Sequence, residues 1–379
     1  MTPSSSTTSA PTVGPPVMTS SMYPQETGFA TLGEIHQAAL ANLPADVADF
    51  LEGGAGGEST LRANRAAFER WAIRPRPMSG VGTPRTDTTF LGIPLALPLL
   101  TAPFGGDGLF DVDGHLAVAR ANAAAGIASI VPEAGTYSYE EVARAAPSAA
   151  RIAQLHPIEH MPVQADRVRA AGYDAVCITV DCPTAGFRTR NRRNRFDPDL
   201  ELFAGNFRGE GTVGVAEMFS RLVGRDDSPP WNWQRLARVA GDFGLPWIAK
   251  GVLTGEAAEA AIAAGAAAIV VSNHGGRQLD PAPASLDQLP DVSATVGGRV
   301  PIAFDSGVRC GTDVFVALGL GADVVVLGRL AAYGLAAAGE DGVRQTLDLV
   351  AEELRTTMIL AGTASLPEID GTFVARRLG

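Results

Sequence analysis

The chain has 379 residues, of which 46% are hydrophobic, and its formal net charge at pH 7 is -11. This composition allows a large buried core, and the negative charge argues against a nucleic-acid-binding protein. Three cysteines without metal-ligand spacing argue against a disulfide framework, so we expect a cytoplasmic protein with no metal site.

The two ends of the chain differ in character. The first 27 residues are rich in Ser, Thr and Pro and lack the basic and apolar regions of a signal peptide. We therefore expect a disordered tail over 1–27 and a single domain over 28–379. No uncharged apolar stretch of about 18 residues occurs, which predicts no membrane contact through a spanning helix.

The domain begins with a helical segment. Apolar positions over 31–51 recur at mostly helical spacing and are interrupted by Pro44, which predicts two short helices. In the glycine-rich turn that follows, Ser59 or Thr60 is the expected cap of a third helix. The dense basic run at 188–195 is interpreted as a solvated loop face.

Eight short apolar runs follow, separated by turns and alanine-rich amphipathic segments. They lie at 97–103, 127–133, 151–155, 174–181, 246–251, 267–273, 301–307 and 323–329. Runs without alternation are typical of strands buried on both faces. Eight such units predict a TIM (β/α)8 barrel. A doubly wound open sheet is the alternative, disfavoured because no GxGxxG follows the first run. The long connection at 189–245, after the fourth strand, predicts a loop that covers the site.

The carboxyl ends of these runs are strongly polar, and in a TIM barrel these ends form the active site. Any one such residue alone is more often a helix cap or a solvated loop residue, but eight polar or glycine-containing ends together indicate a ligand site. The residues concerned are Gln154, His156, Thr179, Asp181, Lys250, Ser272, His274, Arg277, Asp305, Arg309, Gly328 and Arg329.

Two chemical signals stand out among the strand ends. The segments 305–311 and 327–329 combine glycines, arginines and expected helix N-termini, which is typical of phosphate binding at the last two barrel strands. Lys250 closes a buried strand and needs an anionic partner, for which a flavin is suited. His274 can accept a proton, and Arg277 can bind a carboxylate through two parallel hydrogen bonds. The pattern indicates an acid substrate next to a base.

Five segments resemble the FMN-dependent 2-hydroxy-acid oxidases and dehydrogenases, the family of glycolate oxidase, lactate oxidase and mandelate dehydrogenase. The segments are ITVDCP (178–183), AKGV (249–252), SNHGGRQLD (272–280), DSGVRCGTD (305–313) and LGR (327–329). The resemblance runs from about Thr31 to Leu378. It implies an FMN-binding TIM barrel that oxidises a 2-hydroxy acid to a 2-oxo acid, with oxygen as electron acceptor and a homotetrameric assembly.

The resemblance also implies a role for each matching residue. His274 takes a proton while hydride passes to flavin N5, or takes the Cα proton itself in the older carbanion view, and Asp181 orients its imidazolium. Arg277 and Arg188 hold the substrate carboxylate, and Lys250 stabilises the reduced flavin. The other expected cofactor contacts are Pro103, Phe104, Gly105, Gln154, Thr179, Ser272, Asp305, Gly307, Arg309, Gly328 and Arg329.

Several positions depart from the family pattern. His156 and Phe50 stand where relatives usually have tyrosines, and Ser306 replaces a glycine near the phosphate. Two further departures lie beside the flavin: Pro132-Glu133 replaces a serine pair, and Phe104-Gly105-Gly106 replaces a small polar residue and alanine. His156 is either a histidine bound to a neighbouring loop or a second titratable group of the site.

The departures leave other functions open. One alternative is an FMN enzyme acting on an unusual biosynthetic carboxylate, with oxidative decarboxylation or oxygenation. Another is a non-redox FMN barrel such as an isopentenyl diphosphate isomerase, which Arg277 disfavours because a diphosphate site would not need a carboxylate clamp beside the base. The third is a non-catalytic flavin binder.

Overall fold

The computed structural model describes residues 28–208, 214–222 and 231–377, so the tail expected at 1–27 lies outside the described residues. Eight parallel strands close into a barrel in the order β10-β11-β4-β5-β6-β7-β8-β9, which confirms the TIM barrel and all eight apolar runs. The strands are β4 (Leu99–Thr101), β5 (Ala128–Val131), β6 (Arg151–Leu155), β7 (Ala175–Thr179), β8 (Trp247–Val252), β9 (Ala268–Val271), β10 (Ile302–Phe304) and β11 (Val324–Leu327).

Alternating residues of the barrel strands face two different cores. In β6, Ile152 belongs to the inner cluster, whereas Ala153 and Leu155 pack into the outer cluster with the surrounding helices. Because side chains alternate along a strand, Gln154 continues the inward series and His156 follows it at the carboxyl end. Because the inner and the outer cluster are both apolar, the sequences of these strands are continuous apolar runs.

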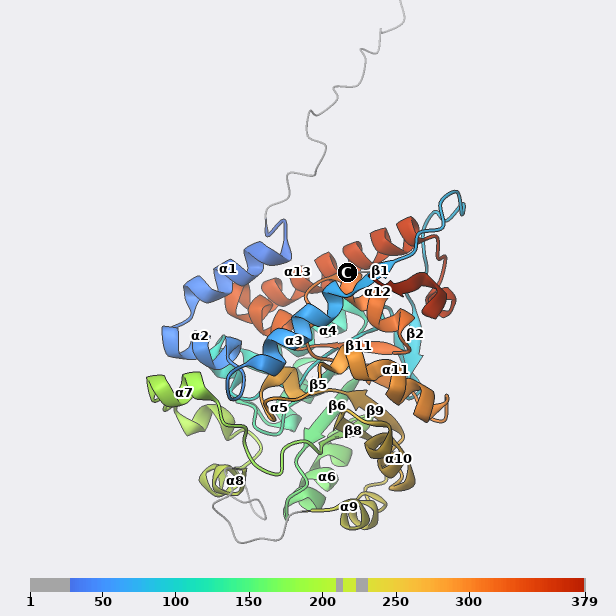
Figure 1. Cartoon of the computed structure of the whole chain (residues 1–379). Coiled ribbons are helices and arrows are strands. Elements are labelled where there is room, and N and C mark those ends of the chain that lie inside the picture. The colour runs from blue at the N-terminus through green and yellow to red at the C-terminus, as the bar shows by residue number, and fades with distance from the viewer. Residues whose placement is uncertain (1–27, 209–213, 223–230, 378–379) are drawn as a thin grey trace, which may run out of the picture.

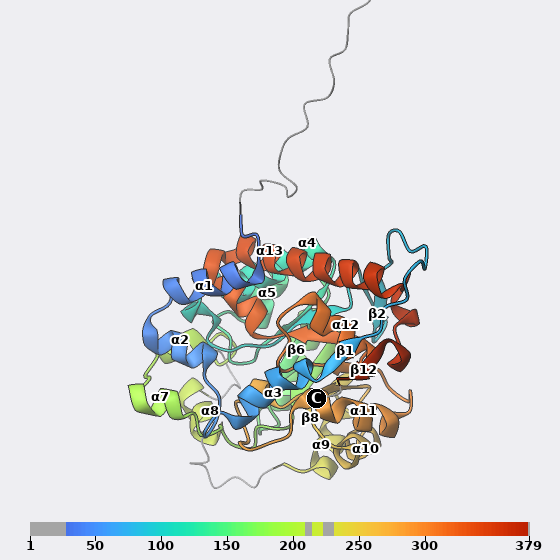
Figure 2. The same cartoon turned by 45° about the horizontal axis from the view of Figure 1, so that its top comes forward.

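Helices surround the barrel, and the amino-terminal pair packs against the last helix. As expected, Pro44 separates α1 (Leu32–Asn42) from α2 (Ala45–Glu52). Figures 1 and 2 both show α1 lying along α13 (Arg329–Ala361), which is kinked at Ala338 and Gly339. The other helices outside the long connection are α3 (Ser59–Glu69), α4 (Gly114–Ala125), α5 (Tyr139–Ala145), α6 (Met161–Ala170), α10 (Gly255–Ala263), α11 (Ser285–Val296) and α12 (Gly311–Gly319).

The amino end of the barrel is closed by a hairpin of β2 (Thr88–Phe90) and β3 (Ile93–Leu95). Its residues Phe90, Ile93 and Leu95 join the inner cluster of the barrel. A second small sheet pairs β1 (Trp71–Ile73) with β12 (Val374–Arg376). With the amino end plugged by apolar side chains, the carboxyl end is the open face of the barrel.

The expected cap of α3 was wrong. The N-cap residue is Glu58, in the left-handed region and without a side-chain cap bond, while Ser59 and Thr60 lie inside the first turn. Asp280 takes the capping role from a distant loop: its carboxylate accepts the Thr60 N–H at 2.7 Å and the Ser59 hydroxyl at 2.6 Å. An acidic side chain is favoured there by the helix dipole, so Asp280 fastens α3 to the loop after β9.

The connection between β7 and β8 holds more structure than a loop. It contains α7 (Thr189–Asn194), the 3-10 turn η2 (Leu200–Phe203), α8 (Val215–Leu222) and α9 (Trp233–Ala240). The basic run is therefore a short helix rather than a loop face. Across the described parts of the chain, no helix is both long enough and apolar enough to cross a bilayer.

Candidate active site

A solvent-open cavity of about 900 Å³ lies at the carboxyl end of the barrel. Strand ends of β4, β8, β10 and β11 form its walls, together with α2 and the 3-10 turn η3 (His274–Gly276). The lining residues include Phe50, Pro103, Phe104, Gly105, Phe110, Arg188, Lys250, His274, Arg277, Asp305, Gly307, Arg309, Gly328 and Arg329.

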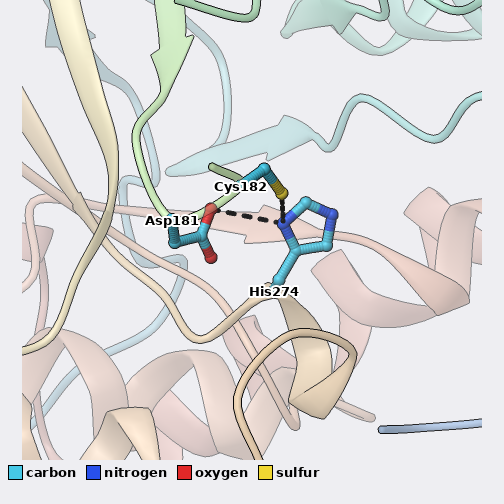
Figure 3. A group of neighbouring side chains, drawn as sticks. All are labelled: Asp181, Cys182 and His274. Atoms are coloured by element: carbon cyan, nitrogen blue, oxygen red, sulfur yellow. Dashed lines mark hydrogen bonds and ion pairs between the residues drawn. The ribbon is translucent and has the colours of Figure 1, made fainter. Parts of the chain in front are cut away.

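His274 is held in the cavity wall by Asp181 and lies beside Cys182 (Figure 3). Its Nδ1 lies 3.4 Å from Asp181 Oδ1 and 3.6 Å from Cys182 Sγ. Asp181 fits behind the imidazole because Gly251 has no side chain: a Cβ there would lie 2.4 Å from Asp181 Cγ. With Nδ1 turned to the carboxylate, Nε2 is the nitrogen left for a substrate.

The electrostatics of this group suit a base. Burial and the charge of Lys250 lower the pKa of His274 from 6.5, against the opposing effect of Asp181. Burial raises the pKa of Asp181, but His274 and Lys250 outweigh it, so the net shift is downward. His274 is thus neutral and Asp181 ionised at neutral pH, ready for proton acceptance.

Two guanidinium groups with free donors lie against the Phe50 ring. The Arg277 guanidinium carbon lies 5.0 Å from the ring centroid and that of Arg188 5.9 Å. Arg277 Nη1 donates to the Phe50 and Gly53 carbonyls, and its Nε and Nη2 have no partner among the described residues. Arg188 Nε is enclosed and has no partner there. Burial and the neighbouring arginines lower the pKa of Arg277, so an anion here relieves unpaired positive charge.

Lys250 forms a buried ion pair at the floor of the cavity. Its Nζ lies 3.4 Å from Asp305 Oδ2 and donates to Ser272 Oγ at 3.1 Å. Burial alone would lower the pKa of Lys250, but Asp305 and Asp181 raise it overall, so the ammonium is charged. The sequence suggested a flavin as the anionic partner of Lys250, whereas the anionic partner within the protein is Asp305; a contact between Lys250 and a flavin stays a prediction.

Ser306 keeps the backbone geometry of the glycine it replaces. Its φ is +83°, in the left-handed region that favours glycine. Its hydroxyl accepts the Gly275 N–H at 3.0 Å and donates to Asp305 Oδ1 at 2.7 Å. The serine therefore ties the end of β10 to η3, which carries His274.

Arg329 and Arg309 lie at the end of the cavity that the sequence assigned to phosphate. Arg329 donates to the carbonyls of Leu51, Gly53 and Gly275, so its guanidinium also fastens α2 to η3. Gly328 leaves free space beside them, since a Cβ there would meet only Ala102 at 3.9 Å.

The β4 side of the cavity is aromatic. Phe104 lies 4.5 Å, between ring centroids, from His115, which is fully enclosed with Asp107 beneath it; His115 Nδ1 lies 3.2 Å from Asp107 Oδ2. Gly106, at φ +64°, leaves room for Phe203 of η2, whose ring atom would lie 2.3 Å from a Cβ. No sequence pattern predicted the Asp107–His115 pair.

His156 is paired with the other departure, Glu133. Glu133 Oε2 accepts His156 N–H and faces His156 Nδ1, both at 2.8 Å, and Oε1 lies 3.0 Å from His160 Nε2. Burial would raise the pKa of Glu133, but hydrogen bonds and charge from both histidines lower it from 4.5 to about 2. The two departures from the family are therefore one structural unit. Asn206 covers it by donating to the Glu133 carbonyl.

The structure brings most of the predicted site residues together, with a few exceptions. Gln154, Thr179 and Ser272 are buried at strand ends and do not line the cavity. Asp181 stands behind His274, and His156 lies outside the cavity lining. Gln154 Oε1 accepts the Glu133 N–H at 3.1 Å, so its amide is already engaged with that unit.

The donor set of the cavity fits a phosphorylated, electron-accepting cofactor together with an acid. Five cationic side chains line it, and Asp305 is the carboxylate among the lining residues. A phosphate and a carboxylate would offset this excess of positive charge. The cationic residues are Arg188, Lys250, Arg277, Arg309 and Arg329.

Fold and site together define a TIM-barrel enzyme of the phosphate-binding, cofactor-dependent kind. The chain matches the FMN-dependent dehydrogenase family over residues 39–376. It is 38% identical to an L-lactate oxidase of Nostoc sp. over 358 residues, covering 90% of this chain and 97% of the relative. It is 39% identical to the 4-hydroxymandelate oxidase of Amycolatopsis orientalis over 349 residues, covering 89% and 96%.

Solved structures agree with this result. A mandelate oxidase in complex with (S)-2-phenylpropionate superposes with a TM-score of 0.83 at 37% identity, covering 93% of this chain and 99% of that one. A lactate oxidase of Pediococcus acidilactici gives a TM-score of 0.85 at 34% identity, covering 94% and 97%. The chain belongs to the FMN-dependent dehydrogenase family and is an FMN-dependent oxidoreductase.

Proposed function

We propose that the protein oxidises a 2-hydroxy acid to the 2-oxo acid and passes the electrons to oxygen. One observation carries the proposal: His274 shares a cavity with two guanidinium groups whose donors are free. A base beside a carboxylate clamp is what removal of a proton and a hydride from a 2-hydroxy acid requires. The relatives named as lactate and 4-hydroxymandelate oxidases support the same substrate class.

The residues of this chain divide the work between them. Arg277 and Arg188 bind the substrate carboxylate and orient the 2-hydroxyl toward His274, whose Nε2 accepts the hydroxyl proton. Asp181 holds the imidazole in the correct orientation and stabilises the imidazolium that forms. Bound FMN supplies the two-electron acceptor.

Other residues of the cavity and of the neighbouring strand ends suit the cofactor. Lys250 and Ser272 would contact its ring system, with Gln154 and Thr179 at the neighbouring strand ends. Pro103, Phe104 and Gly105 would lie along one face. Asp305, Gly307, Arg309, Gly328 and Arg329 would hold the ribityl chain and phosphate, where glycines admit close approach.

An altered substrate is the second candidate, and the β4 to β6 side of the site favours it. Phe104 and the Glu133–His156 pair stand where the family pattern has smaller polar groups and a tyrosine. A carboxylate of different shape, oxidised with loss of CO2 or insertion of oxygen, is the substrate that this side favours. Cytoplasmic location and a homotetramer stay predictions.

Anaerobic flavin bleaching separates these functions. Purified holoprotein is mixed with glycolate, lactate, mandelate and 4-hydroxymandelate, and the loss of flavin absorbance is followed. At least one acid is expected to bleach the flavin, and readmitted oxygen to restore it. If none does, ordinary 2-hydroxy acid oxidation is wrong, and a flavin-binding protein without turnover or with an unrelated carboxylate substrate is favoured.

A further inference from the structure

Glu133 is a fully buried carboxylate that faces two imidazoles and one backbone N–H. The contacts are His156 N and Nδ1, each at 2.8 Å, and His160 Nε2 at 3.0 Å. An ionised carboxylate with no exposed surface needs a counter-charge, because an unpaired charge in the protein interior is costly. The titratable side chains in contact with it are these two histidines.

The structure indicates which histidine carries the positive charge. Both rings donate to Glu133, so the question is which ring has a second proton on its other nitrogen. His160 Nδ1 is enclosed and has no hydrogen-bond partner among the described residues. A proton there would be a buried, unpaired donor, which is unfavourable. His160 is therefore the neutral ring.

His156 has no such obstacle. Its Nε2 is absent from the enclosed, unpartnered atoms, and 11% of its side chain is exposed. It follows Ile152 and Gln154 in the inward-facing series of β6, which places it at the mouth of the barrel. A second proton on this ring can meet water or an anion.

The other groups around His156 do not supply the charge. Tyr139 of α5 lies behind β6 and donates its hydroxyl to the Gln154 carbonyl, and burial raises its pKa well above 10.0. Asp181 follows the neighbouring strand β7 and is paired with His274. Gln154 is uncharged: its Oε1 accepts the Glu133 backbone N–H, and its Nε2 lies 3.4 Å from His156 Nδ1.

We propose that Glu133 is a positioning residue that holds His156 as an imidazolium. His156 lies at the barrel mouth beside the residues that line the cavity, and its Nε2–H is a third cationic donor for a substrate carboxylate that extends past them. The assignment of the ligand rests on the proposed function. The charge on His156 does not, because it follows from the protein alone. His156 thereby adds charge where a tyrosine would offer only a neutral hydroxyl.

Nitrogen NMR of the protein labelled with 15N-histidine tests the charge directly. The chain has five histidines, and H156Q and H160Q assign the two signals of interest. At pH 7 both nitrogens of His156 are expected at the chemical shifts of a protonated ring, and His160 at those of a neutral one. In E133Q, His156 is expected to become neutral. A neutral His156 in the wild-type protein, with or without FMN, overturns the proposal.

Steady-state kinetics tests the role in binding. E133Q and H156Q are each expected to raise KM for the acid substrate on the order of tenfold at pH 7 while kcat stays within about threefold. An unchanged KM in both variants overturns the binding role.

H160Q is the matched control, because its amide can still donate to Glu133. A purely structural role predicts that H160Q and E133Q lower the melting temperature alike and change KM alike, which would contradict the proposal. If no 2-hydroxy acid reduces the flavin of wild-type protein, the proposed function fails, and the NMR result still decides the charge on His156.

Discussion

The two sides of the barrel mouth are built differently. On the side of β8 to β11, Lys250 and Asp305 pair inside the cavity, and His274 lies in its wall with its carboxylate partner behind it. On the side of β4 to β6, Glu133 and both of its histidines are withdrawn from the cavity lining. The first side keeps the family pattern except at Ser306, whereas the second carries the departures around Phe104, Glu133 and His156.

Both sides nevertheless use a carboxylate against an imidazole Nδ1. The separation is 3.4 Å for Asp181 and His274 but 2.8 Å for Glu133 and His156. The pairs differ in their surroundings: burial and the charge of Lys250 lower the pKa of His274, while the Glu133 carboxylate is shared with a second histidine. One arrangement thus yields a neutral base, and we infer that the other yields a charged donor. We propose that the β8 to β11 side carries the chemistry and that the β4 to β6 side affects substrate preference.

Removing the base on the β8 to β11 side should cause the largest loss of activity. For H274Q we expect flavin reduction by substrate to slow by about 10²–10⁴-fold, because the hydroxyl proton loses its acceptor. FMN content, measured by absorbance after gel filtration, should stay unchanged, since His274 is not needed to hold the phosphate. A variant that reduces at the wild-type rate would show that the base lies elsewhere, with His156 the first alternative.

Replacing the carboxylate clamp should come next. R277K keeps the positive charge but cannot present two parallel donors, and it loses the contacts with the Phe50 and Gly53 carbonyls. We expect kcat/KM to fall by about 10²-fold, mainly through KM. R309K at the phosphate end is the matched control and should weaken FMN binding instead of raising KM for the acid. Equal KM values for R277K and wild type would contradict the clamp.

The pH profile of kcat/KM should report on His274. Because the pKa of His274 is lowered from 6.5 and its neutral form is the active base, kcat/KM should be level near neutral pH. It should fall about tenfold per pH unit once the pH drops below that lowered pKa. Stopped-flow reduction measured across acidic and neutral pH checks this. An acidic inflection above 6.5 would contradict the assignment.

The sequence predicted which residues lie on the β8 to β11 side of the mouth, because their placement depends on local patterns. His274 and Arg277 follow an apolar run directly, and Lys250 ends one, so their placement on one face came from strand ends alone. The Glu133–His156–His160 unit could not be predicted in the same way. Its members lie on different barrel units, and their pairing depends on the register of neighbouring strands; the only signal was that two family departures occurred together.

Other misses have the same physical origin. Asp280 caps a helix whose first residues are about 220 positions away in sequence, with sequence separations of 221 and 220 for Ser59 and Thr60. Nothing in the turn before α3 reveals that partner, so local capping rules chose Ser59 or Thr60 instead. Asp107 and His115 are close in sequence, but their enclosure depends on how Phe104 packs over them.

The smallest expected effect concerns Ser306, the departure from the family pattern on the β8 to β11 side of the mouth. S306A removes the hydroxyl that binds Gly275 and Asp305 while keeping a side chain at φ +83°. We expect it to lower the free energy of unfolding by about 1–3 kcal/mol.

S306G loses the same hydrogen bonds but relieves the left-handed backbone strain, worth about 1 kcal/mol. It should therefore melt higher than S306A by roughly 2–4 °C, measured by thermal unfolding of holoprotein. Equal melting temperatures for the two variants would show that the backbone at Ser306 stores no strain. S306G melting above the wild-type protein would show that the hydroxyl contributes less than the strain it accompanies, so that the tie between β10 and η3 serves to place His274 rather than to stabilise the fold.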